Sequence, residues 1–131
     1  MAKFIKRLKK SIGTVENALI IGTAFGYLDQ LPDHFNTVFV HNKNNNIRKK
    51  NLVRIDSFDD IEISNSIHVV FFDLDYLPHI DKITGVLTRQ RPYLIVEGNE
   101  VVERSNVECL YKAGYRAIEK LGMFHIWKMI K

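Results

Sequence analysis

The sequence predicts a three-layer α/β fold, with one mostly parallel sheet between two layers of helices. Short apolar runs rich in β-branched and aromatic residues alternate along the chain with segments of helical or turn pattern, which is typical of such sheets. The last part of the chain differs, because 115–121 and 124–130 predict two strands joined by a tight turn. We therefore expect parallel strands closed by a hairpin whose last strand is antiparallel to its neighbours. The five apolar runs are 18–21, 37–41, 52–55, 67–72 and 93–96.

Length and composition allow one domain and exclude several protein classes. The chain has 131 residues, 46% of them hydrophobic, which suits a single domain spanning 1–131. One cysteine, Cys109, excludes a disulfide framework and a cysteine-rich zinc module. No apolar run approaches the ~20 residues that cross a bilayer, and no signal peptide opens the chain. We expect a soluble, cytoplasmic domain.

A basic amphipathic helix is expected within residues 1–12. Apolar residues recur there at helical spacing with basic residues between them, and Gly13 ends the pattern. Residues 1–10 hold five basic side chains and no acid, whereas the other 14 basic and 15 acidic side chains sum to −1. We expect the apolar stripe to pack on the sheet; binding of nucleic acid or an anionic membrane through residues 3–10 is the alternative. A second basic cluster comprises Lys43, Arg48, Lys49, Lys50 and Arg54.

The other helices are expected to be short. Residues 27–35 can form a helix that its proline interrupts, and the asparagine-rich segment 42–46 predicts a turn. Residues 79–88 predict a further helix. Helical periodicity over 101–113 predicts the last one, which Gly114 ends.

A glycine-containing turn after the first apolar run is one candidate site. Gly22 and Gly26 flank Thr23 and Ala24 in this turn. In nucleotide-binding α/β folds such a turn lets backbone N–H groups approach the ligand, because glycine has no Cβ. An ordinary strand-to-helix turn explains the two glycines equally well.

Two carboxylates, Asp73 and Asp75, follow the run 67–72 and form a second candidate site. Ligands of open α/β sheets bind at the carboxyl ends of the strands. Continued strand alternation would place both side chains on the same side, where they could share Mg²⁺ or hold a polar substrate. The alternatives are that both face solvent or that one caps the following helix.

Three more polar residues lie where apolar runs end. His41 closes the run 37–41 and is the histidine placed nearest a ligand at this edge. Asp56 and Ser57 follow 52–55, where an N-cap is the ordinary explanation. The five histidines show no metal-binding spacing, so the sequence predicts no metal site.

Four segments together resemble class I S-adenosylmethionine-dependent methyltransferases, and most closely the FkbM-type family, over most of residues 17–128. The stretch from Ile20 to Gly26 is similar to the family's D-I-G-A-N-x-G turn. Phe72-Asp73-Leu74-Asp75-Tyr76 resembles its I-D-V-E-G segment. Val86-Leu87 followed by 91–97 resembles its V-L and K-P-x-I-x-x-E pattern, and 110–115 resembles its closing L-x-x-x-G-Y.

The resemblance implies a Rossmann-like methyltransferase fold with strand order 3-2-1-4-5-7-6 and S-adenosylmethionine as cofactor. It implies that Asp73 and Asp75 face the methyl acceptor, and it assigns no catalytic base. In the implied cofactor site, the methionine part would be held by Gly22, Thr23, Ala24 and Gly26. The ribose would lie at His41 or Asn42, and the adenine would lie near Asp56 and Ser57.

Two departures from the family pattern affect the implied cofactor site. Ile20 stands where the family has an acid before the first glycine, and His41 or Asn42 stands where it has the ribose-binding acid. Losing such hydrogen-bonded carboxylates costs roughly 1.5–3 kcal/mol each. The expected function is a methyltransferase-like domain with degenerate cofactor motifs, in which cofactor binding is weakened or lost.

Two other functions stay open. A non-enzymatic interaction module would use the basic N-terminal arm or the basic cluster between Lys43 and Arg54. The stretch from Val69 to Asp75 is also similar to the Asp-x-Asp strand of haloacid-dehalogenase-type phosphatases and of nucleotide-sugar glycosyltransferases, which implies Mg²⁺-dependent phosphotransfer or glycosyl transfer. Tyr76-Leu77 stands where those phosphatases have Gly-Thr.

Overall fold

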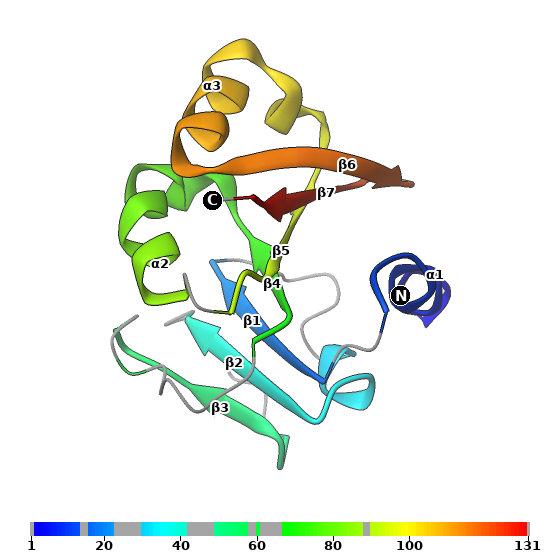
Figure 1. Ribbon diagram of the computed structural model, residues 1–131. Coiled ribbons are helices and arrows are strands. Elements are labelled where there is room, and N and C mark those ends of the chain that lie inside the picture. Colours follow the sequence, from blue (N-terminus) through cyan, green and yellow to red (C-terminus); the bar gives the residue numbers. More distant parts are fainter. Residues whose placement is uncertain are drawn as a thin grey trace.

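A computed structural model describes residues 2–13, 16–22, 30–41, 49–57, 60, 67–87 and 90–130. Its centre is a seven-stranded sheet with the order β3-β2-β1-β4-β5-β7-β6, as predicted (Figure 1). The five strands from β3 to β5 are parallel, and β7 is antiparallel to both of its neighbours. The strands are β1 Asn17–Ile21, β2 Thr37–His41, β3 Leu52–Arg54, β4 Val69–Phe72, β5 Tyr93–Glu97, β6 Tyr115–Leu121 and β7 Phe124–Met129.

Three α-helices are described: α1 Ala2–Ile12, α2 Ile80–Leu87 and α3 Arg104–Ala113. The helix expected over 101–113 starts later, because Glu103 is extended and separates α3 from the 3₁₀ turn η4 Asn99–Val102. In the described part of 27–35 the expected helix is reduced to the 3₁₀ turn η1 Leu31–Asp33, with a proline inside it. A further 3₁₀ helix, η3 Leu74–His79, leads from β4 into α2.

Each face of the sheet is covered by helices, so the predicted three layers are present. Alternate strand residues on one face, such as Leu19 and Val70, share a core with α2 and α3. Residues on the other face, such as Ile20 and Val38, share a second core with α1 and η1. Figure 1 shows α1 apart from the other two helices, near the end of β6. The expected packing of the apolar stripe of α1 on the sheet is confirmed.

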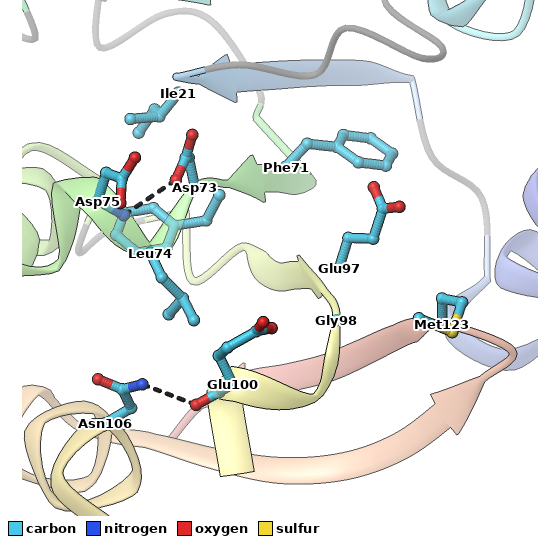
Figure 2. A pocket seen from close by; sticks show the side chains of 11 residues that line it. Ile21, Phe71, Asp73, Leu74, Asp75, Glu97, Gly98, Glu100, Asn106 and Met123 are labelled. Atoms are coloured by element: carbon cyan, nitrogen blue, oxygen red, sulfur yellow. Dashed lines mark hydrogen bonds between the residues drawn. The ribbon is translucent and has the colours of Figure 1, made fainter. Parts of the chain in front are cut away.

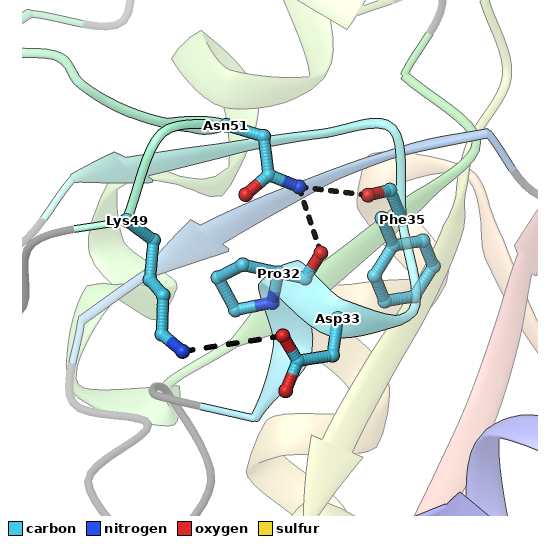
Figure 3. A network of polar contacts seen from close by, with 5 residues as sticks. All are labelled: Pro32, Asp33, Phe35, Lys49 and Asn51. Atoms are coloured by element: carbon cyan, nitrogen blue, oxygen red, sulfur yellow. Dashed lines mark hydrogen bonds and ion pairs between the residues drawn. The ribbon is translucent and has the colours of Figure 1, made fainter.

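A small polar network fixes η1 within this second layer (Figure 3). The Asn51 side-chain amide donates to the carbonyls of Pro32 and Phe35, at 2.7 and 2.9 Å. Lys49 lies 4.0 Å from the Asp33 carboxylate. These contacts tie the turn before β3 to η1. The Asn51 amide satisfies two backbone carbonyls that lie outside the hydrogen-bond ladders of the sheet.

The order of the strands creates a switch point between β1 and β4. The chain leaves β1 toward β2 and β3 on one side and then continues with β4 on the other side of β1. In open α/β sheets the crevice outside the carboxyl ends of the strands at such a point is where ligands bind. In the part of the chain that the structure describes, no helix has the length and apolarity needed to cross a membrane.

Candidate functional site

A cavity of about 540 Å³ lies at the carboxyl ends of β1, β4 and β5, at the switch point (Figure 2). Its volume is typical of small-molecule sites. Apolar side chains, including Ile21, Leu74 and Met123, form part of its lining. Its polar side chains are Asp73, Asp75, Glu97, Glu100 and Asn106.

Gly22 allows the ends of β1 and β4 to approach each other closely. Its φ is +93°, a conformation that favours glycine, and a Cβ at this position would lie 2.4 Å from Cβ of Asp73. The Gly22 N–H donates to the His41 carbonyl at 3.1 Å, and the Asp73 N–H donates to the Ile21 carbonyl at 3.0 Å. The Asp73 carboxylate therefore occupies the space directly beside the first residue after β1.

Asp73 and Asp75 both line the cavity, but not by strand alternation. Strand β4 ends at Phe72, and Asp73 is the extended N-cap of η3. Its Oδ1 accepts a hydrogen bond of 2.9 Å from the Asp75 N–H. The alternation of β4 does not continue to Asp75, because the backbone turns into a 3₁₀ helix, and the capping alternative describes Asp73 correctly.

The opposite wall comes from the segment after β5. Gly98 has a φ of +96°, and a Cβ there would meet Oε2 of Glu100 at 2.7 Å. The Gly98 N–H donates to the Met123 carbonyl at 2.8 Å, which joins this wall to the β6–β7 turn. Asn106 of α3 donates its side-chain N–H to the Glu100 carbonyl at 2.7 Å (Figure 2).

The sequence-based prediction of site residues missed Glu97 and Glu100. Glu97 is the last residue of β5, so the edge rule that selected Asp73 applies to it equally. Glu100 follows a glycine and belongs to a 3₁₀ turn, for which the local sequence carries no comparable signal.

The cavity is an acidic site. Four carboxylates contribute to its lining, and the described lining residues include no lysine, arginine or histidine. A cleft lined by one sign of charge raises the local concentration of ligands of the opposite sign. The cavity therefore favours a cation or a ligand rich in hydrogen-bond donors. Among the described residues, no three histidine, cysteine, aspartate or glutamate side chains form a group that could hold a metal ion.

The other predicted site residues lie elsewhere at this edge or outside the description. His41 ends β2, and its ring packs edge-on against Tyr76 with 5.7 Å between centroids. Asp56 and Ser57 follow β3, where the Ser57 N–H donates to the Asp60 carboxylate at 3.0 Å, as at a helix N-terminus. None of these three belongs to the described lining of the cavity. Thr23, Ala24, Gly26 and Asn42 lie outside the described residues.

Comparison with known proteins identifies the fold. No known sequence family and no curated protein match the chain. The N-methyltransferase NodS from Bradyrhizobium japonicum WM9 is similar in structure, with a TM-score of 0.63 and 11% identity over 98% of this chain and 94% of that one. A structure of NodS in complex with S-adenosyl-L-homocysteine gives a TM-score of 0.61 and 12% identity over 98% of this chain and 85% of that one. The chain therefore has the fold of the class I S-adenosylmethionine-dependent methyltransferases.

Proposed function

We propose that this chain is a methyltransferase-like domain that binds S-adenosylmethionine in the acidic cavity. The observation that carries the proposal is the position of Asp73, which lies against Gly22 at the switch point between β1 and β4. The structural likeness to NodS, which has been solved with S-adenosyl-L-homocysteine, supports the same assignment.

The residues that form the cavity fit the charge of this cofactor. S-adenosylmethionine carries a sulfonium and an ammonium cation beside one carboxylate, so its net charge is +1 and the four carboxylates of the lining attract it. S-adenosylhomocysteine has a neutral sulfur instead. The lining should therefore prefer the cofactor to its product.

Asp73 compensates for the acid that β1 lacks. Ile20 is fully buried in the core beneath α1, and Ile21 presents an apolar side chain to the cavity. No carboxylate from β1 can therefore reach the cofactor. Asp73, the residue that follows β4, supplies one, and we assign to it the acceptance of hydrogen bonds from the amino group of the methionine part.

The remaining cofactor contacts follow from the sequence resemblance. Backbone N–H groups of the turn that begins with Gly22 would approach the methionine part. His41 or Asn42 would lie at the ribose, and Asp56 with Ser57 near the adenine. None of these side chains belongs to the described cavity lining, so we expect binding to depend chiefly on the carboxylates of that lining.

The other acids of the cavity suit an acceptor with a nitrogen nucleophile. When bound, the cofactor supplies an electrophilic methyl group. Asp75, Glu97 and Glu100 can accept N–H hydrogen bonds from an amine or amino group and hold it in position, which contributes to rate through orientation. NodS is an N-methyltransferase, which agrees with this choice.

Within the methyltransferases, we propose that the chain is related to the FkbM-type family. Two of the segments that carry the resemblance, 72–76 and 91–97, contribute Asp73, Asp75 and Glu97 to the cavity. The resemblance is therefore concentrated at the proposed site.

Isothermal titration calorimetry with the two ligands tests the proposal. We expect S-adenosylmethionine to bind about tenfold more tightly than S-adenosylhomocysteine, a difference of about 1.4 kcal/mol. Asp73→Asn should weaken the cofactor about tenfold and reduce this preference, while its amide oxygen still accepts the Asp75 N–H. Asp81→Asn, at an exposed site in the first turn of α2, makes the same chemical change outside the cavity and should leave binding unchanged.

Two results would contradict the proposal at different levels. No heat with either ligand at millimolar concentration removes the cofactor and leaves the non-enzymatic interaction function. Binding that Asp73→Asn and Asp81→Asn affect equally removes the role of Asp73 but keeps the cofactor.

A further inference from the structure

The outward face of α1 is a continuous row of cations. Lys3, Lys6, Arg7 and Lys10 are exposed and recur at intervals of three, one and three residues, which places them on one side of the helix. The helix contains no acid. At 1.5 Å per residue the row extends over about 10 Å along the helix.

The inward side of α1 fixes this row in place. Ile5 and Leu8 are buried in the core on this face of the sheet. Lys9 is separate from the row, because its Nζ donates to the His34 carbonyl at 2.8 Å and lies over the ring of Phe35. The four outward cations are thus presented by a helix whose position the core determines.

Phe4 connects this helix to the cavity. Its ring stacks on Phe124, with 4.1 Å between centroids, and meets Phe71 edge-on at 6.5 Å. Phe71 lines the cavity, and so does Met123, which precedes Phe124. Phe4 therefore places α1 next to the part of the cavity wall that Phe71 and Met123 form.

We propose that the outward face of α1 binds the phosphate backbone of a single-stranded nucleic acid beside the cavity. The inference rests on the proposed function insofar as the strand would be the methyl acceptor. Phosphates are attracted by the cations of α1 and repelled by the carboxylates of the cavity, so the two regions orient a strand with its backbone along the helix. Carboxylates accept hydrogen bonds from amino groups of bases, which the backbone phosphates cannot supply.

An anionic membrane fits the same face less well. Amphipathic helices that bind membranes bury their apolar face in the lipid. In this structure Ile5 and Leu8 already pack on the sheet. A lipid surface would gain only the charge attraction, roughly 1 kcal/mol for each cation.

The test is fluorescence anisotropy with a labelled 12-nucleotide single-stranded RNA, the full chain and no cofactor, at 50–200 mM salt. Four phosphate contacts predict a slope of log affinity against log salt of about −3, which lowers the affinity about 50-fold over this range. Lys6→Gln/Arg7→Gln removes two contacts and should bring the slope to about −1.4. Lys6→Arg/Arg7→Lys retains the charges and should retain the slope.

The matched control is Lys49→Gln/Lys50→Gln, which removes the same charge at the turn before β3. We expect it to leave the slope unchanged; an equal effect of the two double variants would show that only net charge matters and would overturn the inference. Binding to vesicles with 30% phosphatidylserine through Lys6 and Arg7, without RNA binding, would also overturn it. Since no cofactor is present, a failed calorimetric titration leaves this result intact, and the reverse also holds.

Discussion

The acidic cavity and the outward face of α1 carry opposite charges. Four carboxylates face the cavity, and four cations cover the helix, while Phe4 and Phe71 join the two regions through an edge-on ring contact. The net charge of +4 describes neither region. The comparison shows that the local distribution of charge, and not its sum, determines which ligands each surface attracts.

The two regions also differ in what fixes their geometry. The cavity depends on glycines with positive φ at which carboxylates pack closely. The row on α1 depends only on apolar burial behind it, and its own side chains are exposed. Substitutions at the cavity edge should therefore affect folding, whereas substitutions on the outward face of α1 should not.

The largest effect is expected from Gly22→Val. A branched side chain meets the Asp73 Cβ and must adopt a φ near +93°, so we expect the free energy of unfolding to fall by about 4 kcal/mol. The urea midpoint measures this loss. Gly85→Ala is the control, because a Cβ in this exposed part of α2 has no atom within 4 Å and should raise stability by about 0.5–1 kcal/mol. A Gly22→Val protein as stable as the original would contradict the close approach of β1 and β4.

Leu8→Ala and Lys6→Ala should differ in their effect on stability, because one residue lies on the buried side of α1 and the other on its exposed side. Leu8 is fully buried, so its truncation should lower the free energy of unfolding by about 3 kcal/mol. Lys6→Ala, on the outward face, should change it by less than about 0.5 kcal/mol. Urea denaturation of the two variants measures both values. Similar losses in the two proteins would mean that the outward side chains take part in packing and are not a free surface.

The sequence predicted the sheet because its strands are defined by local apolar runs. It also predicted the packing of α1, since Ile5 and Leu8 recur at helical spacing. It offered helix capping by Asp73 or Asp75 only as an alternative to strand alternation, and it did not predict Glu100 in the cavity wall, because both depend on backbone turns and on glycine conformations that tertiary contacts select. The strands can be predicted from the local pattern of the sequence. The cavity cannot, because its shape depends on how the ends of the strands meet in the folded chain.

The smallest effect is expected at His125 in the β6–β7 hairpin, where it tests whether a neighbouring lysine acts on a partly buried histidine. Burial lowers the pKa of His125 below its usual 6.5, and Lys120, its cross-strand partner, lowers this pKa further. Its buried Nε2 has no hydrogen-bond partner among the described residues, so the imidazolium gains little in the folded state. Because the pKa is lower in the folded chain, His125 contributes stability above pH 6.5, and this contribution is lost as the pH falls through the folded pKa.

We expect the urea midpoint to fall between pH 7.5 and pH 5.5, and to fall less in His125→Gln. Lys120→Gln should have an intermediate effect, because it removes the repulsion and leaves the burial. If Lys120→Gln behaves as the unchanged chain does, burial alone lowers this pKa, and the charge of Lys120 does not act on His125. An intermediate fall of the midpoint would instead show that the positive charge of Lys120 on β6 acts on His125 across the hairpin.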